Sequence, residues 1–146
     1  MSAPRIQLIA DDAIAIVTIL QEAEGEPFEG KLAVAEVILS RTRHRYNSDG
    51  TIMGTCLAPL QFSGWNSKST NRIRTMRCCE ADPMVADCVR AWNLATAGSS
   101  TVQGALLYYS PATLVALGVP APDWASPLKS KQVATVGHHI FFVPLV

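Results

Sequence analysis

The segment Leu20–Arg41, LQEAEGEPFEGKLAVAEVILSR, constrains the fold of this chain most, because two apolar helical patterns meet in it at a corner. Proline suits the first turn of a helix, and Pro27 disfavours helical geometry at Glu26 before it. The segment therefore predicts a first helix that ends near Glu22. A second helix is expected from Phe28 to about Arg45, where apolar residues recur at helical spacing.

The first helix is expected to be central, because its apolar run Ala13–Leu20 leaves few polar positions. Asp11 or Asp12 can cap its start, and Gly25 can end it in a left-handed turn. The run is too short to cross a bilayer, and acidic residues in front of it are the wrong flank for a signal peptide. We therefore expect neither stable membrane insertion nor an export signal.

The composition is that of one globular domain. The chain has 146 residues, of which 49% are hydrophobic and 16% charged. A single hydrophobic core can stabilise a chain of this size, so we expect one catalytic domain over residues 1–146, acting as a monomer. Twelve basic and twelve acidic residues cancel, which argues against nucleic acid as a partner.

The remaining elements are predicted from turn signals and periodicity. Residues 46–80 have little periodicity and are expected to form surface loops with short helical turns. Asp82-Pro83 predicts the start of a helix that Gly98 ends. Further on, GALLYYSP favours a strand, ATLVALG a short helix, and QVATVG with HIFFV two strands joined at Gly137. The order predicts a mainly helical α+β domain with a small C-terminal β-hairpin.

The four cysteines match no compact disulfide framework and no zinc pattern, so we expect free thiols, mostly buried, and neither a metal nor a cofactor. One alternative function uses them. A thiol amidase or endopeptidase would pair Cys56 with His138 or His139, although nothing near Cys56 shows how its pKa would be lowered.

Two glutamates at the corner are candidates for acid chemistry. Glu22 follows Ile19 and Leu20, and apolar neighbours can keep a carboxylic acid protonated near neutral pH, as cleavage of a glycosidic bond requires. A plain surface glutamate at a helix end would show the same pattern. Glu26 can supply a second carboxylate, but its position before proline favours a structural role as the anion that starts the second helix.

The pentapeptide QFSGW at residues 61–65 combines polar groups with aromatic rings. Gln61 and Ser63 can bond the hydroxyl and N-acetyl groups of a sugar, while the ring of Trp65 can cover its apolar face. Ordinary anchoring of a loop explains the pattern equally well.

Two residue pairs near the C-terminus are expected to point to opposite faces of strands, because adjacent strand residues alternate. Tyr108 and Tyr109 would place one phenol in the interior and one in a cleft. His138 and His139 would diverge in the same way at a strand start. Structural roles for these four side chains are an open alternative.

The blocks EAEGEPFEGKLAVAEVILSR, QFSGW, GALLYY and GHHIFF, in this order, resemble the SleB-like cell-wall hydrolases of the spore-cortex-lytic type. The resemblance implies a lysozyme-like fold and cleavage of the β-1,4 bond between N-acetylmuramic acid and N-acetylglucosamine in peptidoglycan glycan strands. It implies that Glu22 is the general acid and then the base of a lytic transglycosylase, which closes a 1,6-anhydro ring. It also implies that Gln61, Ser63 and Tyr109 line the cleft and that His139 supports it.

Several alternatives remain open from the sequence. A lysozyme-type muramidase would need Glu26 or Asp123 to hold a water molecule, and a non-catalytic wall-binding module would need no acid. The absence of a visible export signal is typical of a phage endolysin. Such an enzyme would accumulate in the host cytoplasm and reach the wall after a holin opens the membrane.

Overall fold

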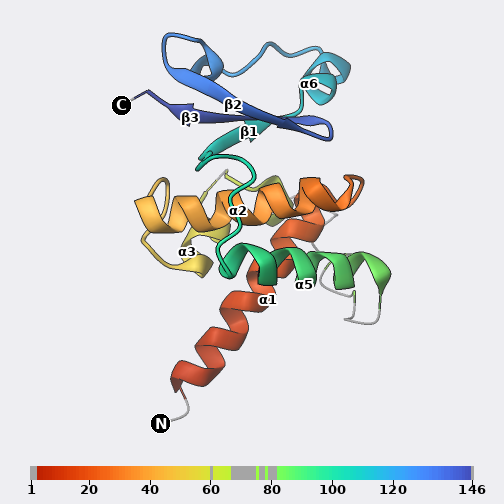
Figure 1. Cartoon of the computed structure of the whole chain (residues 1–146), viewed down its shortest axis with the longest axis vertical. Helices are drawn as coiled ribbons and strands as arrows, with labels where there is room; N and C mark the ends of the chain where they lie inside the picture. Colours follow the sequence, from red (N-terminus) through yellow and green to blue (C-terminus); the bar gives the residue numbers. More distant parts are fainter. Residues whose placement is uncertain (1–2, 60, 67–74, 76–77, 79–81, 146) are drawn as a thin grey trace.

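The computed structural model describes the chain except residues 1–2, 60, 67–74, 76–77, 79–81 and 146. Helices form one layer and a small antiparallel sheet lies over them (Figure 1). The prediction of a mainly helical α+β domain is confirmed. No helix in the described part of the chain is long and apolar enough to span a membrane.

The corner between the first two helices forms as predicted, but the first helix begins earlier. Helix α1 spans Ala3–Ala23 and α2 spans Phe28–His44. The prediction that Asp11 or Asp12 caps α1 is wrong, because both residues lie inside the helix, where Asp12 accepts a hydrogen bond from the Trp92 indole at 2.9 Å. Gly25 does not have the expected left-handed φ.

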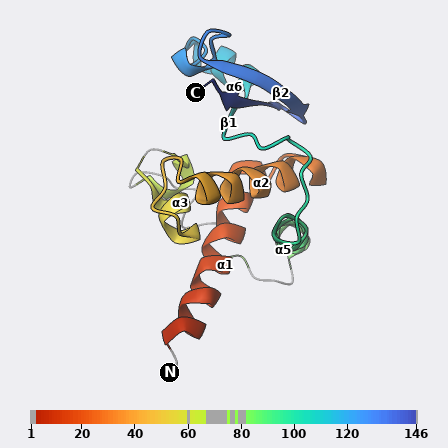
Figure 2. The same cartoon turned by 60° about the vertical axis from the view of Figure 1, so that its left-hand side comes forward.

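Helix α2 lies between the sheet and the other helices, as two views of the molecule agree (Figures 1 and 2). Val34 and Ile38 pack into the core shared with α1 and α5, whereas Ala33 and Val37 pack against Phe141 of the sheet. A helix that is apolar on both sides belongs in the middle of a domain. The apolar residues on both sides of α2 therefore join the two layers.

Short helices complete the helical layer. Helix α3 spans Ile52–Leu57, the 3-10 helix η1 spans Ser63–Trp65, and α5 spans Pro83–Thr96. The predicted helix after Asp82 is thereby confirmed. A loop then leads to the sheet, and the buried carboxylate of Glu36 fixes it by accepting hydrogen bonds from the Thr101 and Val102 amides at 2.6 and 3.1 Å.

The strand predicted in GALLYYSP and the two strands of the predicted hairpin form one three-stranded sheet. Strands β1 (Leu107–Tyr109), β2 (Ser130–Val136) and β3 (His139–Pro144) are antiparallel in the order β1-β3-β2. Tyr108 pairs with Phe141. Helix α6 (Pro111–Leu117) and the 3-10 helix η2 (Asp123–Ala125) lie between β1 and β2 in the chain.

The turn between β2 and β3 consists of Gly137 and His138, because Val136 pairs with His139. Gly137 has φ +57°, which a two-residue hairpin turn requires at its first position and which glycine adopts without strain. This turn reaches the corner between α1 and α2.

Candidate active site

Glu22 lies at the wall of an open hollow of about 350 Å³ between the helical corner and the sheet. The described residues that line the hollow come from the corner, from the start of α6 and from the hairpin turn. They are Glu22, Gly25, Glu26, Ser110, Ala112, Thr113, His138 and His139. The hollow thus contains two carboxylates four residues apart.

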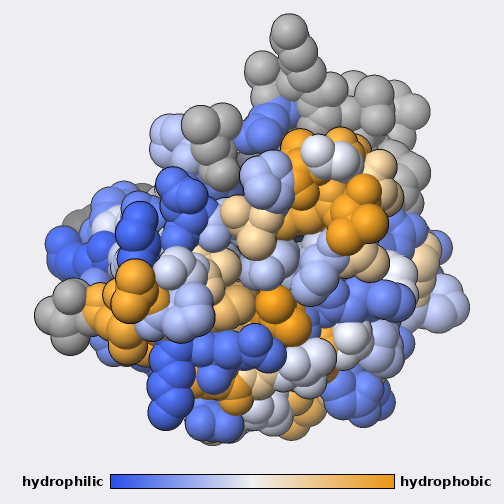
Figure 3. All heavy atoms as spheres, turned by 90° about the horizontal axis from the view of Figure 1, so that it is seen from above, coloured by the Kyte–Doolittle hydropathy of each residue, from blue (hydrophilic) through white to orange (hydrophobic). Residues whose placement is uncertain are grey.

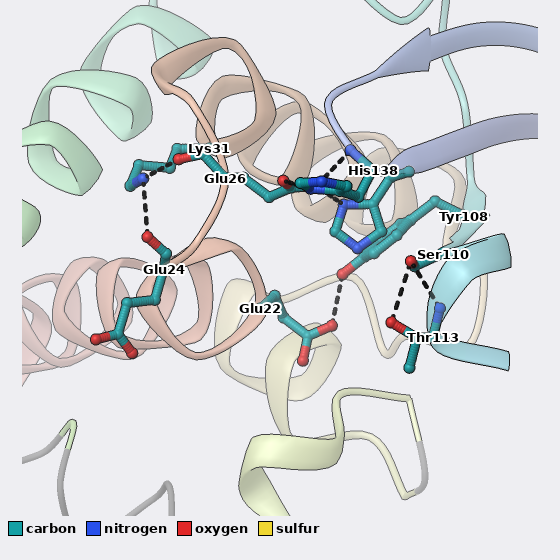
Figure 4. A network of polar contacts seen from close by, with 9 residues as sticks. Glu22, Glu24, Glu26, Lys31, Tyr108, Ser110, Thr113 and His138 are labelled. Atoms are coloured by element: carbon teal, nitrogen blue, oxygen red, sulfur yellow. Dashed lines mark hydrogen bonds and ion pairs between the residues drawn. The ribbon is translucent and has the colours of Figure 1, made fainter. Parts of the chain in front are cut away.

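Glu22 is held by Tyr108, whose hydroxyl donates a hydrogen bond to Oε1 of Glu22 at 2.6 Å (Figure 4). Burial raises the pKa of the Glu22 carboxyl, while the Tyr108 hydrogen bond and the charge of Arg41 oppose that rise. The pKa of Tyr108 is raised well above its ordinary value, chiefly by burial, so this phenol stays a donor. The arrangement presents a carboxylic acid that favours its protonated form.

Tyr108 is itself fixed by aromatic neighbours. Its ring centroid lies 5.0 Å from that of His139 in an edge-on contact and 5.4 Å from that of Phe141. Edge-on and tilted packing of this kind adds to the burial energy and fixes ring orientation. Strand β3 therefore determines where the phenol oxygen meets Glu22.

Glu26 lies in a different environment from Glu22. Its Oε1 accepts a hydrogen bond from the His138 amide at 2.8 Å, and its Oε2 lies 2.6 Å from Nδ1 of His138. Nδ1 of His139 is 2.9 Å from Oε1, within ion-pair distance. The Glu26 carboxylate therefore joins the corner to the hairpin turn.

These contacts set opposite pKa shifts for the two acids. Burial raises the pKa of Glu26, but the His138 hydrogen bonds and the charges of both histidines outweigh it and lower the pKa below its ordinary value. Burial lowers the pKa of His139, against the influence of Glu26. The two environments therefore separate the pKa values, so that Glu22 favours its neutral form and Glu26 its anionic form.

Glycines make room for Glu26. A Cβ added at Gly137 would lie 3.0 Å from each carboxylate oxygen of Glu26, and one at Gly30 would lie 2.7 Å from its Cβ. The backbone carbonyl of Glu26 accepts a hydrogen bond from the buried Lys31 ammonium at 2.5 Å (Figure 4). The prediction that the Glu26 carboxylate stabilises the first amide groups of the second helix is wrong, because this carboxylate contacts His138 of the hairpin turn instead.

The histidines differ from the expected alternation. Both His138 and His139 bring Nδ1 to the Glu26 carboxylate, since His138 belongs to the turn and only His139 begins β3. Their expected divergence to opposite faces is therefore wrong. No cluster of three or more potential metal ligands suited to an ion occurs among the described residues.

Tyr109 does not line this hollow. Its ring stacks against Phe142 at 5.8 Å and meets Trp124 edge-on at 5.7 Å, on the face of β1 opposite to Tyr108. The resemblance implied that Tyr109 lines the cleft, but strand alternation turns Tyr109 away and places the Tyr108 hydroxyl against Glu22. Seen from the sheet end, apolar patches lie among hydrophilic ones (Figure 3). Exposed apolar side chains of this region include Val115 and Leu117 of α6.

The segment 61–65 packs beside α1, one turn before Glu22. The Trp65 indole donates a hydrogen bond to Thr18 at 2.8 Å, and a Cβ at Gly64 would lie 2.5 Å from Cδ of Gln21. Ser63 is exposed. The side chain of Gln61 accepts a hydrogen bond from Asn47 at 3.1 Å. Sugar binding by Gln61, Ser63 and Trp65 stays a prediction, and the geometry shows that the segment anchors a loop.

Cys56 is buried, and burial raises the pKa of its thiol to about 12. Cys88 also carries a free thiol, as expected, while Cys79 lies outside the described residues, as does most of loop 66–81. A thiol that stays protonated is a poor nucleophile. The Cys56 thiol-enzyme alternative therefore has no support in this geometry.

Sequence reasoning missed Arg41 as part of the site. Only 4% of this residue is exposed, and its Nε donates a hydrogen bond to the Leu106 carbonyl at 2.7 Å. The signal was present in the sequence, since an arginine continues the apolar face of α2.

Replacing Tyr108 with Phe is expected to raise the pKa of Glu22 further, by about one unit, because a hydrogen bond to the carboxylate is lost. The measurement is a carbon NMR titration of the glutamate side chains, with the Glu22 signal identified by its absence in Glu22→Gln. Tyr109→Phe is the matched control and should leave the titration unchanged. An unaltered midpoint in Tyr108→Phe would contradict the assigned hydrogen bond.

Comparison with known proteins agrees with this geometry. The chain is 30% identical over 136 residues to a spore cortex-lytic enzyme of Oceanobacillus iheyensis, covering 93% of this chain and 40% of that protein. It is 28% identical over 120 residues to the spore cortex-lytic enzyme of Bacillus subtilis, covering 82% of this chain and 33% of the relative. The chain thus spans well under half the length of these relatives.

The fold is similar to two solved structures. One is the catalytic domain of the germination-specific lytic transglycosylase SleB from Bacillus anthracis, with a TM-score of 0.67, 23% identity, and coverage of 91% of this chain and 93% of that one. The other is the catalytic domain of the Bacillus cereus SleB protein, with the same TM-score and identity and coverage of 91% and 89%. The sequence profile of the family described as Cell Wall Hydrolase matches residues 25–142, and the chain therefore belongs to that family.

Proposed function

We propose that this protein is a lytic transglycosylase, which cleaves the β-1,4 bond between N-acetylmuramic acid and N-acetylglucosamine in peptidoglycan, with Glu22 as its acid and base. The observation that carries the proposal is the contrast between the two carboxyls of the hollow. The pKa of Glu22 is raised, whereas Glu26 is occupied by His138 and His139.

The proposed reaction uses one carboxyl twice. Glu22 donates its proton to the glycosidic oxygen as the bond to C1 of the muramyl sugar breaks, which leaves positive charge at C1. The resulting Glu22 carboxylate then accepts the proton of the C6 hydroxyl, whose oxygen bonds to C1. Glu22 returns to its acid form, and no water molecule is consumed.

The same contrast argues against the muramidase alternative. A hydrolase with a second carboxylate needs that carboxylate to hold a water molecule. Among the described residues that line the hollow, Glu26 is the only other carboxylate, and its oxygens already contact the His138 amide and both imidazoles. Asp123, the other candidate, begins η2 and does not line the hollow.

Product analysis tests the proposal. Purified peptidoglycan digested with the protein should yield muropeptides with 1,6-anhydro ends by mass spectrometry, and digestion in oxygen-labelled water should leave those ends unlabelled. Labelled reducing ends would show hydrolysis and support the muramidase instead. Binding to cell walls without released fragments would support the wall-binding alternative.

Substrate class and location are separate parts of the proposal. The family description and the names of the relatives support a cell-wall substrate. A role as a phage endolysin, with accumulation in a host cytoplasm, stays a prediction. Tracking the tagged protein through an infection cycle would test it.

A further inference from the structure

Arg41 carries a buried charge that has no carboxylate partner among the residues that the structure describes. Only 4% of the residue is exposed, and among the described residues no carboxylate lies within ion-pair distance of its guanidinium. Its Nη1 is buried and has no hydrogen-bond partner in the described part of the chain. An unpaired buried charge is costly, so its presence calls for a physical reason.

The contacts that Arg41 does make converge on the elements around Glu22. Nε donates to the carbonyl of Leu106, two residues before Tyr108, and the guanidinium carbon lies 4.9 Å from the ring centroid of Phe62. Arg41 therefore joins the end of α2 to the entry of β1 and to segment 61–65. The positive charge is fixed in place by these contacts.

The charge of Arg41 also acts on the Glu22 carboxyl. It lowers the pKa of Glu22 against the effect of burial, and it lowers that of Tyr108 in the same way. The other titratable groups around the guanidinium are Tyr46, after α2, and Cys56, on α3. Burial raises the pKa of the Cys56 thiol to about 12, so it is neutral at working pH. Among these groups Glu22 is the carboxyl, and its ionised form would supply the negative charge opposite the Arg41 guanidinium.

We propose that Arg41 is a positioning residue that acts through Glu22: its fixed, buried positive charge stabilises the Glu22 carboxylate formed once the proton has been donated. This inference rests on the proposed function. During the reaction the acid loses its proton to the leaving oxygen and regains one from the C6 hydroxyl. Between these steps a buried carboxylate must exist, and a preorganised positive charge stabilises it without reorganisation of solvent.

The decisive experiment is the carbon NMR titration of Glu22 in the full chain, because it does not depend on activity. In Arg41→Met the Glu22 midpoint should move up by about one pH unit or more, as expected for loss of a nearby opposite charge. Arg41→Lys keeps the charge and should stay closer to the wild-type midpoint. Arg43→Met removes an exposed arginine from the same helix and should leave the midpoint unchanged.

A purely structural role of Arg41 would give a different result. It would lower the melting temperature of Arg41→Met while leaving the Glu22 midpoint of the folded protein where it is, and that result would overturn the proposal. An equal upward shift in Arg41→Lys would also overturn it, since the charge is retained. Arg41→Gln, which keeps a donor for the Leu106 carbonyl, replaces the methionine variant if that variant does not fold.

Activity separates this inference from the proposed function. The pH profile of glycan cleavage should move upward in the neutral Arg41 variants together with the titration midpoint. If the wild-type protein releases no anhydro fragments, the proposed function fails, while the titration still decides whether Arg41 stabilises the carboxylate.

Discussion

Replacing Glu22 with Gln is expected to lower the rate of glycan cleavage by about 10²- to 10⁴-fold, because the amide can neither donate the proton nor accept it back. The structure should be retained, since an amide oxygen still accepts the hydrogen bond that the Tyr108 hydroxyl donates. The measurement is release of soluble muropeptides from purified peptidoglycan over time, together with the melting temperature of the variant.

Glu29→Gln is a matched control for the loss of charge. Glu29 is an exposed glutamate in the first turn of α2, outside the hollow, and its variant should cleave at the wild-type rate. Persistence of wild-type cleavage in folded Glu22→Gln would contradict the assignment of Glu22 as the acid.

Replacing Glu26 with Gln is expected to lower the free energy of unfolding by about 2–3 kcal/mol at neutral pH, because a buried carboxylate that accepts a hydrogen bond from the His138 amide is exchanged for a neutral amide. The side chains of Glu26 and His139 are 6% and 13% exposed, so solvent screens their contact only weakly, whereas the imidazole of His138 is 72% exposed. Urea denaturation monitored by circular dichroism measures this decrease in the free energy of unfolding.

The pH dependence of stability distinguishes this carboxylate from others. The folded-state pKa of Glu26 lies below the ordinary value of 4.5, so its stabilisation is complete above that value and is lost as the pH falls through the folded-state pKa. The pKa of His139 is also lowered, from 6.5, so acid first protonates the unfolded chain at this position and destabilises the fold. Both groups make the wild-type protein less stable in acid.

The difference in the free energy of unfolding between wild type and Glu26→Gln should therefore be largest near neutral pH and should shrink below about pH 4.5. Glu29→Gln again serves as the control and should follow the wild-type curve. A difference that stays constant down to pH 3 would show that the carboxylate charge contributes nothing to the contact with the hairpin turn.

The local parts of the fold were predictable because the signals for them lie close together in the chain. Pro27 and the apolar spacing on both sides of it determine the corner between α1 and α2, and Asp82-Pro83 determines the start of α5. Glu22 was accessible to sequence reasoning for the same reason. Its apolar neighbours and the following break are adjacent to it in the sequence.

The partners of the two acids were not predictable in this way. Tyr108 and Tyr109 are both compatible with β1, and only the pairing of Tyr108 with Phe141 determines which phenol faces Glu22. The expected alternation of His138 and His139 failed because Gly137 and His138 form the turn itself. In both cases the pairing register between strands, rather than the local residue pattern, determines where the side chains point.

The strand order has a consequence for when the candidate site can form during synthesis of the chain. Strand β3 lies between β1 and β2, yet it is the last strand to be made, so neither of the others has a pairing partner until it emerges. The contacts that hold the two acids join residues 86 and 112 positions apart. A nascent chain that still lacks residues 139–144 therefore cannot fix Tyr108 against Glu22, and the hollow around Glu22 forms only once β3 has been made.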